Sequence, residues 1–391
     1  MCIIKSSSYT GIPMKLILKL LAGIVLGVLL GLLLPDAALR PFITLKVLLG
    51  DFIGFVIPFI IIFYITHGIA GLGHQSGRIV GLTVGLTYFS TILAGSMAAL
   101  VAIAVLPGFS TKMAILDATP SLAPYFSLSI PPIMPVMTAV LLAFLFGIGI
   151  SKSHGHVLKD ATHEGKLIMD KLLSHVLIPM LPLYVACIFA DITANGAALD
   201  TIKTFLVVLA LAMVLHTVWL TLLYALAGLI AGKNPLRLLT NMFPAYFAAA
   251  STMSSAATIP VTLRSVKNNG VRPYIADFGV PLCATIHLCG SMITLTSCAV
   301  AVTLISPGLP APSFETMFPF IMALGFVMIA APGVPGGGVM AALGLLASML
   351  GFDETALGLM IALYVAQDSL GTAANVTGDG ALLIIIDKWT P

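Results

Sequence analysis

Two carboxylates lie inside a long apolar run near the C-terminus, residues 357–386. They are Asp368 and Asp379, and two further polar residues, Thr372 and Asn375, lie between them. The steps of four, three and four residues place all four side chains on one face of an α-helix, because a helical turn takes about 3.6 residues. The sequence therefore predicts a polar stripe along one apolar helix.

This stripe offers three kinds of polar group. The carboxylate of Asp368 can pair with an ammonium group, the amide of Asn375 can donate to a carboxylate, and Asp379 can supply a hard oxygen ligand to a dehydrated cation. A carboxylate in a membrane helix costs about 2.5–3.5 kcal/mol on insertion scales, which favours a functional site. The alternative, a structural ion pair, is weakened because no Lys or Arg occurs between Arg272 and Lys388.

His287 lies in the middle of another apolar segment, residues 281–291. A buried histidine most often serves as a satisfied hydrogen-bonding group, which favours a structural or site-lining role here. Because imidazole titrates near neutrality, a proton relay stays open as the alternative. A metal pair with Cys289 is less favoured than either.

Two further apolar segments, Phe243–Thr262 and Met328–Leu345, are interrupted by small polar residues, Gly and Pro. An unwound backbone inside a membrane is tolerated only where protein buries it or where it lines a cavity. Paired interrupted segments therefore indicate a transporter's binding site, often within inverted repeats. The alternative is a pair of kinked helices packed through small residues.

The rest of the chain must hold these groups inside a membrane. Of its 391 residues 59% are hydrophobic and 8% charged, whereas soluble domains carry about 25% charged residues. Several apolar runs approach or exceed the roughly 20 residues that a membrane-spanning helix needs, and they lack the period of two that a β-barrel requires. We therefore expect an all-α polytopic membrane protein, with no nucleic-acid partner and no organic cofactor.

The positions of the basic residues predict the orientation. If the N-terminus is cytoplasmic, 14 of the 18 Lys and Arg residues fall on the cytoplasmic side, which is where such residues accumulate. We therefore expect a multi-pass protein of the plasma (inner) membrane with an even number of spans and both termini cytoplasmic. We expect no enzyme, because no nucleophile, base and orienting group recur at a plausible spacing.

Three motifs resemble, in the same order, those of the dicarboxylate/amino-acid:cation symporter family, to which glutamate and neutral amino-acid transporters belong. They are residues 254–264, 333–338 and 368–379, and the resemblance covers nearly the whole chain. It implies eight transmembrane helices and two re-entrant helical hairpins, near 236–268 and 313–350, in an elevator-type transporter that forms a homotrimer in the lipid bilayer.

The same resemblance implies a division into two domains. A fixed scaffold domain would comprise spans 1 and 2 and spans 4 and 5. A mobile transport domain would comprise span 3, span 6, the first hairpin, span 7, the second hairpin and span 8. The implied bounds are 1–72 and 111–198 for the scaffold domain, and 73–110 and 199–391 for the transport domain.

The resemblance also implies a substrate site. Ser254 and Ser255 would bind the substrate carboxylate together with Asn375, and Asp368 would bind the α-amino group. The other residues implied to form the substrate site are Thr372, Gly371, Val334 and Gly338.

For the coupling ion, the resemblance implies two sodium sites. Asp379, the Asn375 carbonyl and carbonyls near His287 would form one, and Thr285 with carbonyls of the second hairpin would form the other. In the seventh span His287-Leu288-Cys289 replaces the family's Asn-Met-Asp, which removes the acid of a third sodium site. We therefore expect fewer coupled sodium ions than in acidic-substrate members, or a proton carried partly by His287.

Two departures concern the substrate. Gly371 stands where acidic-substrate members have an arginine, and Tyr364 stands where they have the acid that pairs with it. A second substrate carboxylate would then be buried without a cation, which costs several kcal/mol. The triplet 367–369, Gln-Asp-Ser, resembles the bacterial serine/threonine branch. We therefore expect a sodium-coupled importer of a small neutral amino acid such as serine, threonine or alanine. A proton-coupled symporter, a dicarboxylate or organic-anion symporter, and a channel or substrate sensor are the alternatives.

Overall fold

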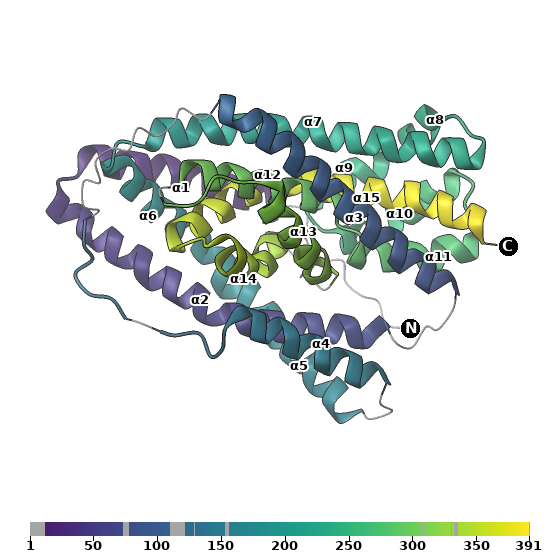
Figure 1. The fold of residues 1–391 in the computed structure, drawn as a ribbon, viewed down its shortest axis with the longest axis horizontal. Helices are drawn as coiled ribbons and strands as arrows, with labels where there is room; N and C mark the ends of the chain where they lie inside the picture. Colours follow the sequence, from purple (N-terminus) through teal and green to yellow (C-terminus); the bar gives the residue numbers. More distant parts are fainter. Residues whose placement is uncertain are drawn as a thin grey trace.

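The computed structural model describes residues 12–72, 78–109, 122–128, 130–152, 156–306, 308–329, 331 and 335–390. Within these ranges every regular element is a helix (Figure 1). The predicted all-α class is therefore confirmed. Of the predicted site residues, Val334 lies outside the described ranges.

Seven helical segments of the described chain are long and apolar enough to cross a membrane. A shorter apolar helix, α4 (Val136–Lys152), covers the segment where we expect the fourth span. The multi-pass membrane class is thus supported, and the count of eight spans stays a prediction. The seven long segments are α1 (Ile12–Leu33), α2 (Asp36–Leu72), α3 (Arg78–Val105, extended by the 3₁₀ turn Leu106–Gly108), α5 and α6 (Val157–Leu172 and Ile178–Ala194, joined by the π-helical turn Leu173–Leu177), α7 (Ala198–Ala231), α11 and α12 (Pro273–Ile286 and Cys289–Ile305), and α15 (Glu354–Trp389).

Glycines at every fourth position of α1 let this helix approach α6 closely. A Cβ atom added to Gly27 would lie 2.3 Å from the carbonyl oxygen of Ala186, and Cβ atoms on Gly23 and Gly31 would lie 2.5 and 2.6 Å from carbonyl oxygens of α6. In a membrane the hydrophobic effect does not drive helices together, because lipid is as apolar as the side chains. Small residues at this spacing instead allow the two backbones to pack closely. The α1–α6 pair is therefore a tight contact that tolerates only glycine on this face.

The helix α15 lies in the interior of the protein. It is buried along nearly all of its length, from Ala356 to Ile386, and packs against α3, α7, α9, α11, α12 and α14. By contrast, α1 exposes apolar side chains such as Leu18, Val25 and Leu32. The polar stripe of α15 therefore faces protein, as carboxylates inside a membrane require.

Two pairs of short helices lie in the second half of the chain (Figure 1), and α9, α10 and α14 of these pairs pack against α15. The first is α9 (Phe243–Thr252) with α10 (Ser255–Asn268), preceded by α8 (Pro235–Thr240), and the second is α13 (Phe314–Met328) with α14 (Gly337–Leu350). These bounds agree closely with the predicted hairpins at 236–268 and 313–350. That the two pairs re-enter the membrane stays a prediction.

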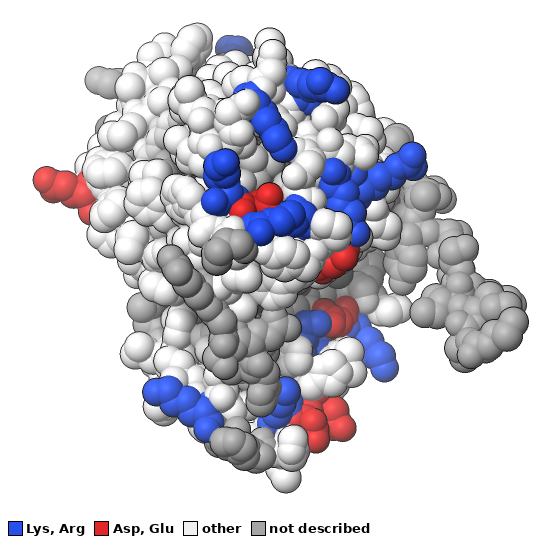
Figure 2. Space-filling model, turned by 90° about the vertical axis from the view of Figure 1, so that its right-hand side faces the viewer, with Lys and Arg blue, Asp and Glu red and all other residues white. Residues whose placement is uncertain are grey.

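Basic side chains gather at the end of the molecule that holds α8 and the C-terminus of α15 (Figures 1 and 2). Lys233 there donates to the carbonyl of Asn269 at 2.7 Å, and Arg272 pairs with Asp387 at 2.8 Å. This end is the one that the charge pattern assigns to the cytoplasm. The assignment itself stays a prediction.

Candidate functional site

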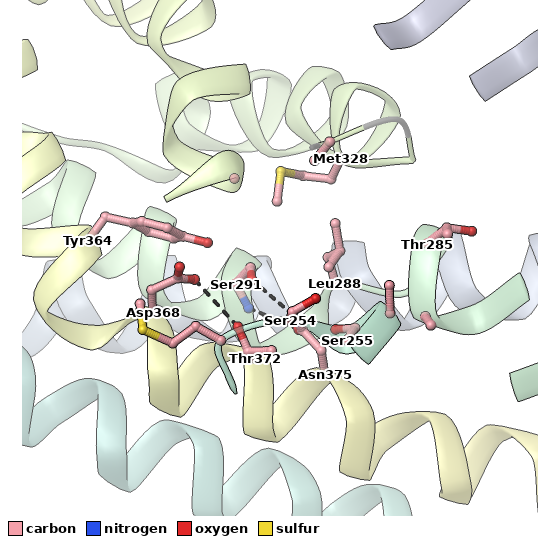
Figure 3. A pocket seen from close by; sticks show the side chains of 15 residues that line it. Ser254, Ser255, Thr285, Leu288, Ser291, Met328, Tyr364, Asp368, Thr372 and Asn375 are labelled. Carbon is pink, nitrogen blue, oxygen red and sulfur yellow. Dashed lines mark hydrogen bonds between the residues drawn. The ribbon is translucent and has the colours of Figure 1, made fainter. Parts of the chain in front are cut away.

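A small cavity of about 80 Å³ lies against the middle of α15 (Figure 3). Its walls come from the α9–α10 connection, from the region where α11 ends and α12 begins, from α13 and α14, and from α15. Four separate segments of the sequence thus meet at one place. Seven of the predicted site residues line the cavity: Ser254, Ser255, Thr285, Gly338, Asp368, Thr372 and Asn375.

Three helix N-termini converge on this cavity. Ser254 is the N-cap of α10, Leu288 is the N-cap of α12, and Gly338 is the second residue of α14, and all three line the cavity. The first turn of a helix presents N–H groups without partners inside the helix, and the positive end of the helix dipole. At α12, Asn375 accepts from two of these N–H groups. This arrangement creates a site that favours a carboxylate or another small anion.

Asp368 supplies the opposite charge. Its Oδ2 accepts a hydrogen bond from the backbone N–H of Gly336 at 2.7 Å, and the Thr372 hydroxyl lies 3.5 Å from its Oδ1. Among the described residues, no Lys, Arg or His forms an ion pair with this buried carboxylate. A buried carboxylate that has no cationic partner is stabilised when a ligand supplies a positively charged group.

Asn375 lines the cavity and also fixes the start of α12. Its Oδ1 accepts from the backbone N–H groups of Gly290 and Ser291 at 2.7 and 3.1 Å, and its Nδ2 donates to the Ser291 hydroxyl at 2.9 Å. An α15 side chain therefore caps α12 in the way that an N-cap residue does. Its predicted contact with the substrate stays a prediction.

His287 and Asp379 lie outside the cavity lining and contact each other. The backbone of His287 is extended and ends α11. Its Nδ1 lies 2.8 Å from Asp379 Oδ1, and its Nε2 lies 2.9 Å from the Ser90 hydroxyl of α3. This buried chain of polar groups links three parts of the helical core.

The second carboxylate oxygen of Asp379 is buried and has no hydrogen-bond partner among the described residues. Because buried polar atoms are almost always paired, this oxygen fits the prediction that a cation binds there. The described residues contain no group of three or more His, Cys, Asp or Glu that could hold a metal ion. Backbone carbonyls would therefore have to supply most of the ligands.

Residues 16–389 match the model of the sodium:dicarboxylate symporter family. The chain belongs to this family. Its members are transporters rather than enzymes, and the resemblance seen in the three sequence motifs is confirmed.

Similarity to individual relatives covers less of the chain. The serine/threonine transporter SstT of Acinetobacter baumannii (strain AYE) is 30% identical over 258 residues, which are 63% of this chain and 62% of that protein. Neutral amino acid transporter A of Homo sapiens is 30% identical over 148 residues, 38% of this chain and 27% of the relative. Excitatory amino acid transporter 1 of Bos taurus is 27% identical over 248 residues, 61% and 44% of the two chains. The chain thus spans about 62% of the length of the bacterial relatives it matches.

In this family member Gly371 faces α12 and does not line the cavity. A Cβ atom on Gly371 would lie 3.3 Å from the Thr294 hydroxyl, and a Cβ atom on Gly290 would lie 2.3 Å from the Gly371 carbonyl oxygen. Gly290 therefore permits the close approach of α12 and α15, and Gly371 lies in this contact. Thr285 does line the cavity, and its hydroxyl donates to the Leu282 carbonyl at 2.7 Å.

Several residues that line the cavity are not among the predicted site residues. Ser291 is the third residue of α12, and its hydroxyl faces the cavity side of the helix start (Figure 3). Met253 adopts a left-handed backbone conformation, with φ 50°, between α9 and α10. Ser291 could have been found from its sequence position, because a hydroxyl residue in the first turn of a helix can face a site at that helix N-terminus. The sequence carries no comparable signal for Met253.

Proposed function

We propose that the chain is a secondary active symporter that imports a small neutral amino acid, such as serine, threonine or alanine, together with sodium. The observation that carries this proposal is the opposition, across one cavity, of three helix N-termini to the carboxylate of Asp368, which forms no ion pair among the described residues. The helix N-termini attract the carboxylate of an amino acid. Asp368 attracts its ammonium group.

The residues that line the cavity favour an amino acid with an uncharged side chain. Among the described residues that line the cavity, Asp368 is the only charged one, and none is Lys, Arg or His. A substrate with a second carboxylate would bury that charge without a cation, at a cost of several kcal/mol. The small volume, about 80 Å³, also favours a small side chain, because sites for drug-sized ligands occupy about 300–1,000 Å³.

Sodium is the coupling ion in this proposal, and it is cargo rather than a resident cofactor. Among the described residues Oδ2 of Asp379 has no hydrogen-bond partner, which supports one site, completed by the Asn375 carbonyl and carbonyls near His287. Thr285 with carbonyls of the α13–α14 pair would form the other. Hard oxygen ligands of this kind suit an alkali or alkaline-earth cation.

A second candidate, proton coupling, is favoured by one observation. The imidazole of His287 bridges Ser90 and Asp379 with contacts of 2.9 and 2.8 Å, and it occupies one of the two oxygens that a cation at Asp379 would use. A proton on His287 could therefore replace a sodium ion in the cycle.

For the mechanism we propose an elevator in a homotrimer of the plasma (inner) membrane, with both termini cytoplasmic and two re-entrant hairpins. We propose two domains, and helices pack on one another within each. The scaffold domain would contain residues 1–72 and 111–198, within which α1 packs on α6 and α2 packs on α4, α5 and α6. The transport domain would contain residues 73–110 and 199–391, within which α15 packs on α7, α9 and α12.

Substrate-induced stabilisation tests the proposed function directly. The full chain in detergent is heated with single amino acids or succinate, with and without sodium, because a bound ligand raises stability by mass action. We expect serine, threonine or alanine to raise Tm in sodium only. Stabilisation by succinate but by no neutral amino acid would contradict the proposed substrate. In liposomes, counterflow of labelled serine against its gradient is expected, and its absence alongside passive flux would indicate a channel.

A further inference from the structure

Tyr364 forms one wall of the cavity and has no role in the proposed function so far. It lies one helical turn before Asp368 on α15, and its side chain is 1% exposed. Figure 3 shows its hydroxyl pointing into the cavity, on the side of Asp368 and Ser291. A buried tyrosine hydroxyl needs hydrogen-bond partners. The polar groups around it therefore indicate which group of a ligand it can bind.

The hydroxyl of Tyr364 faces the same side of the cavity as the Asp368 carboxylate and the Ser291 hydroxyl (Figure 3). Ser291 in turn accepts a hydrogen bond from Asn375 at 2.9 Å. A carboxylate only accepts hydrogen bonds, so Asp368 can accept one from a nearby hydroxyl but cannot donate one. This part of the cavity wall therefore carries two hydroxyls, of Tyr364 and Ser291, beside one group that only accepts.

Tyr364 also sets a boundary of the cavity. A Cβ atom built on Gly338 would lie 2.4 Å from the Tyr364 hydroxyl oxygen and 3.2 Å from the terminal methyl of Met328. The tyrosine hydroxyl therefore contacts the N-terminus of α14, and only a glycine leaves room for it. Tyr364 closes the space between α14 and α15.

We propose that Tyr364 is a specificity-determining residue that, with Ser291, binds a hydroxyl on the side chain of the amino acid. The inference rests on the proposed function and narrows its substrate class to β-hydroxy amino acids over alanine. A phenol and an alcohol each donate and accept, so the hydroxyls of Tyr364 and Ser291 can each donate to or accept from a substrate hydroxyl. A side-chain carboxylate would instead lie beside Asp368 with no cation.

The ring of Tyr364 has a separate consequence. Because the hydroxyl reaches Gly338, the ring limits how long a substrate side chain can be. Tyr364→Leu replaces the ring with a shorter side chain. We expect this variant to bind amino acids with longer unbranched side chains, such as norvaline, and the unchanged chain to exclude them. An unchanged size limit in this variant would contradict the boundary role.

The test for hydroxyl recognition is a ratio of affinities. Dissociation constants for L-serine and L-alanine are measured by calorimetry in saturating sodium on the full chain and on Tyr364→Phe, which keeps the ring. We expect the preference for serine over alanine to fall about tenfold, as the loss of one hydrogen bond implies. Alanine affinity is expected to stay within about twofold.

Two further variants complete the design. Tyr224→Phe is the matched control, because Tyr224 is equally buried and its hydroxyl donates to the Thr377 carbonyl of α15 at 2.8 Å, away from the cavity. Its serine preference should be unchanged. Ser291→Ala removes the second hydroxyl and should lower the preference even if Tyr364→Phe folds poorly.

The outcomes separate the two levels of the proposal. An unchanged serine-to-alanine ratio in both Tyr364→Phe and Ser291→Ala, or an equal loss for both ligands, would overturn the role of Tyr364 and leave the proposed function standing. No binding of any amino acid by the unchanged chain would contradict the proposed function itself.

Discussion

Asp368→Asn isolates the charge that we assign to ammonium binding. The amide has nearly the shape of the carboxylate and its oxygen can still accept from the Gly336 N–H, which donates at 2.7 Å. The negative charge is lost, and the second oxygen becomes a donating amide nitrogen, which can donate to the Thr372 hydroxyl at that position. A bound ammonium group would then be buried without a counter-charge, which costs about 3–5 kcal/mol, so serine affinity should fall between about 100-fold and about 4,000-fold.

The size of this effect is measurable as ligand-induced stabilisation. Serine at 100 times its dissociation constant stabilises a protein by about 2.7 kcal/mol, and a 100-fold loss of affinity reduces this to about 0.4 kcal/mol. Without ligand, the variant should be at least as stable as the unchanged chain, because Asp368 is buried without an ion-pair partner among the described residues. The free energy of unfolding is therefore measured with and without serine.

A control variant separates this effect from a general loss of negative charge. Asp200→Asn removes a carboxylate from an exposed pair with Lys203, whose N–O distance is 3.3 Å, and should keep full stabilisation by serine. If Asp368→Asn retained serine-induced stabilisation within about threefold in affinity, Asp368 would not bind the ammonium group, and the assignment of the cavity would be wrong.

Three other predictions concern the cation and the packing. Asp379→Asn should raise the sodium concentration needed for serine binding about tenfold or more without changing serine affinity in saturating sodium; an unchanged sodium titration would contradict the site. Gly27→Leu should lower Tm, because even a Cβ atom at this position would lie 2.3 Å from the Ala186 carbonyl oxygen. Overpacking typically costs about 1–3 kcal/mol of stability. An unchanged Tm would contradict the close contact between α1 and α6. Lys46→Met should destabilise by about 3–5 kcal/mol, because it leaves Asp191 buried without its partner at 2.6 Å. Adding Asp191→Leu should recover most of that loss, and no recovery would argue against an uncompensated charge.

Much of the site could be predicted because it depends on local spacing. Asp368, Thr372 and Asn375 share a helix face by periodicity alone, and the structure brings all three to one cavity. The interruption at Ser254 was visible in the run of small and hydroxylated residues. Positions where a helix begins or ends leave local signals in the sequence.

The partners of these residues could not be predicted in the same way. Asn375 caps α12 across 85 residues of sequence, and Ser90 meets His287 across 197. Such contacts depend on how α3, α12 and α15 are placed against one another. For the same reason Gly371, predicted as a substrate residue from its place in a motif, is found packed against α12.

Uptake of labelled L-serine into liposomes that contain the full chain tests the central claim most directly. With an inward sodium gradient and equal pH on both sides, we expect serine to accumulate above its external concentration and unlabelled succinate to leave uptake unchanged. Accumulation driven by a pH gradient without sodium would contradict sodium coupling, and no accumulation under either gradient would contradict the proposed symport.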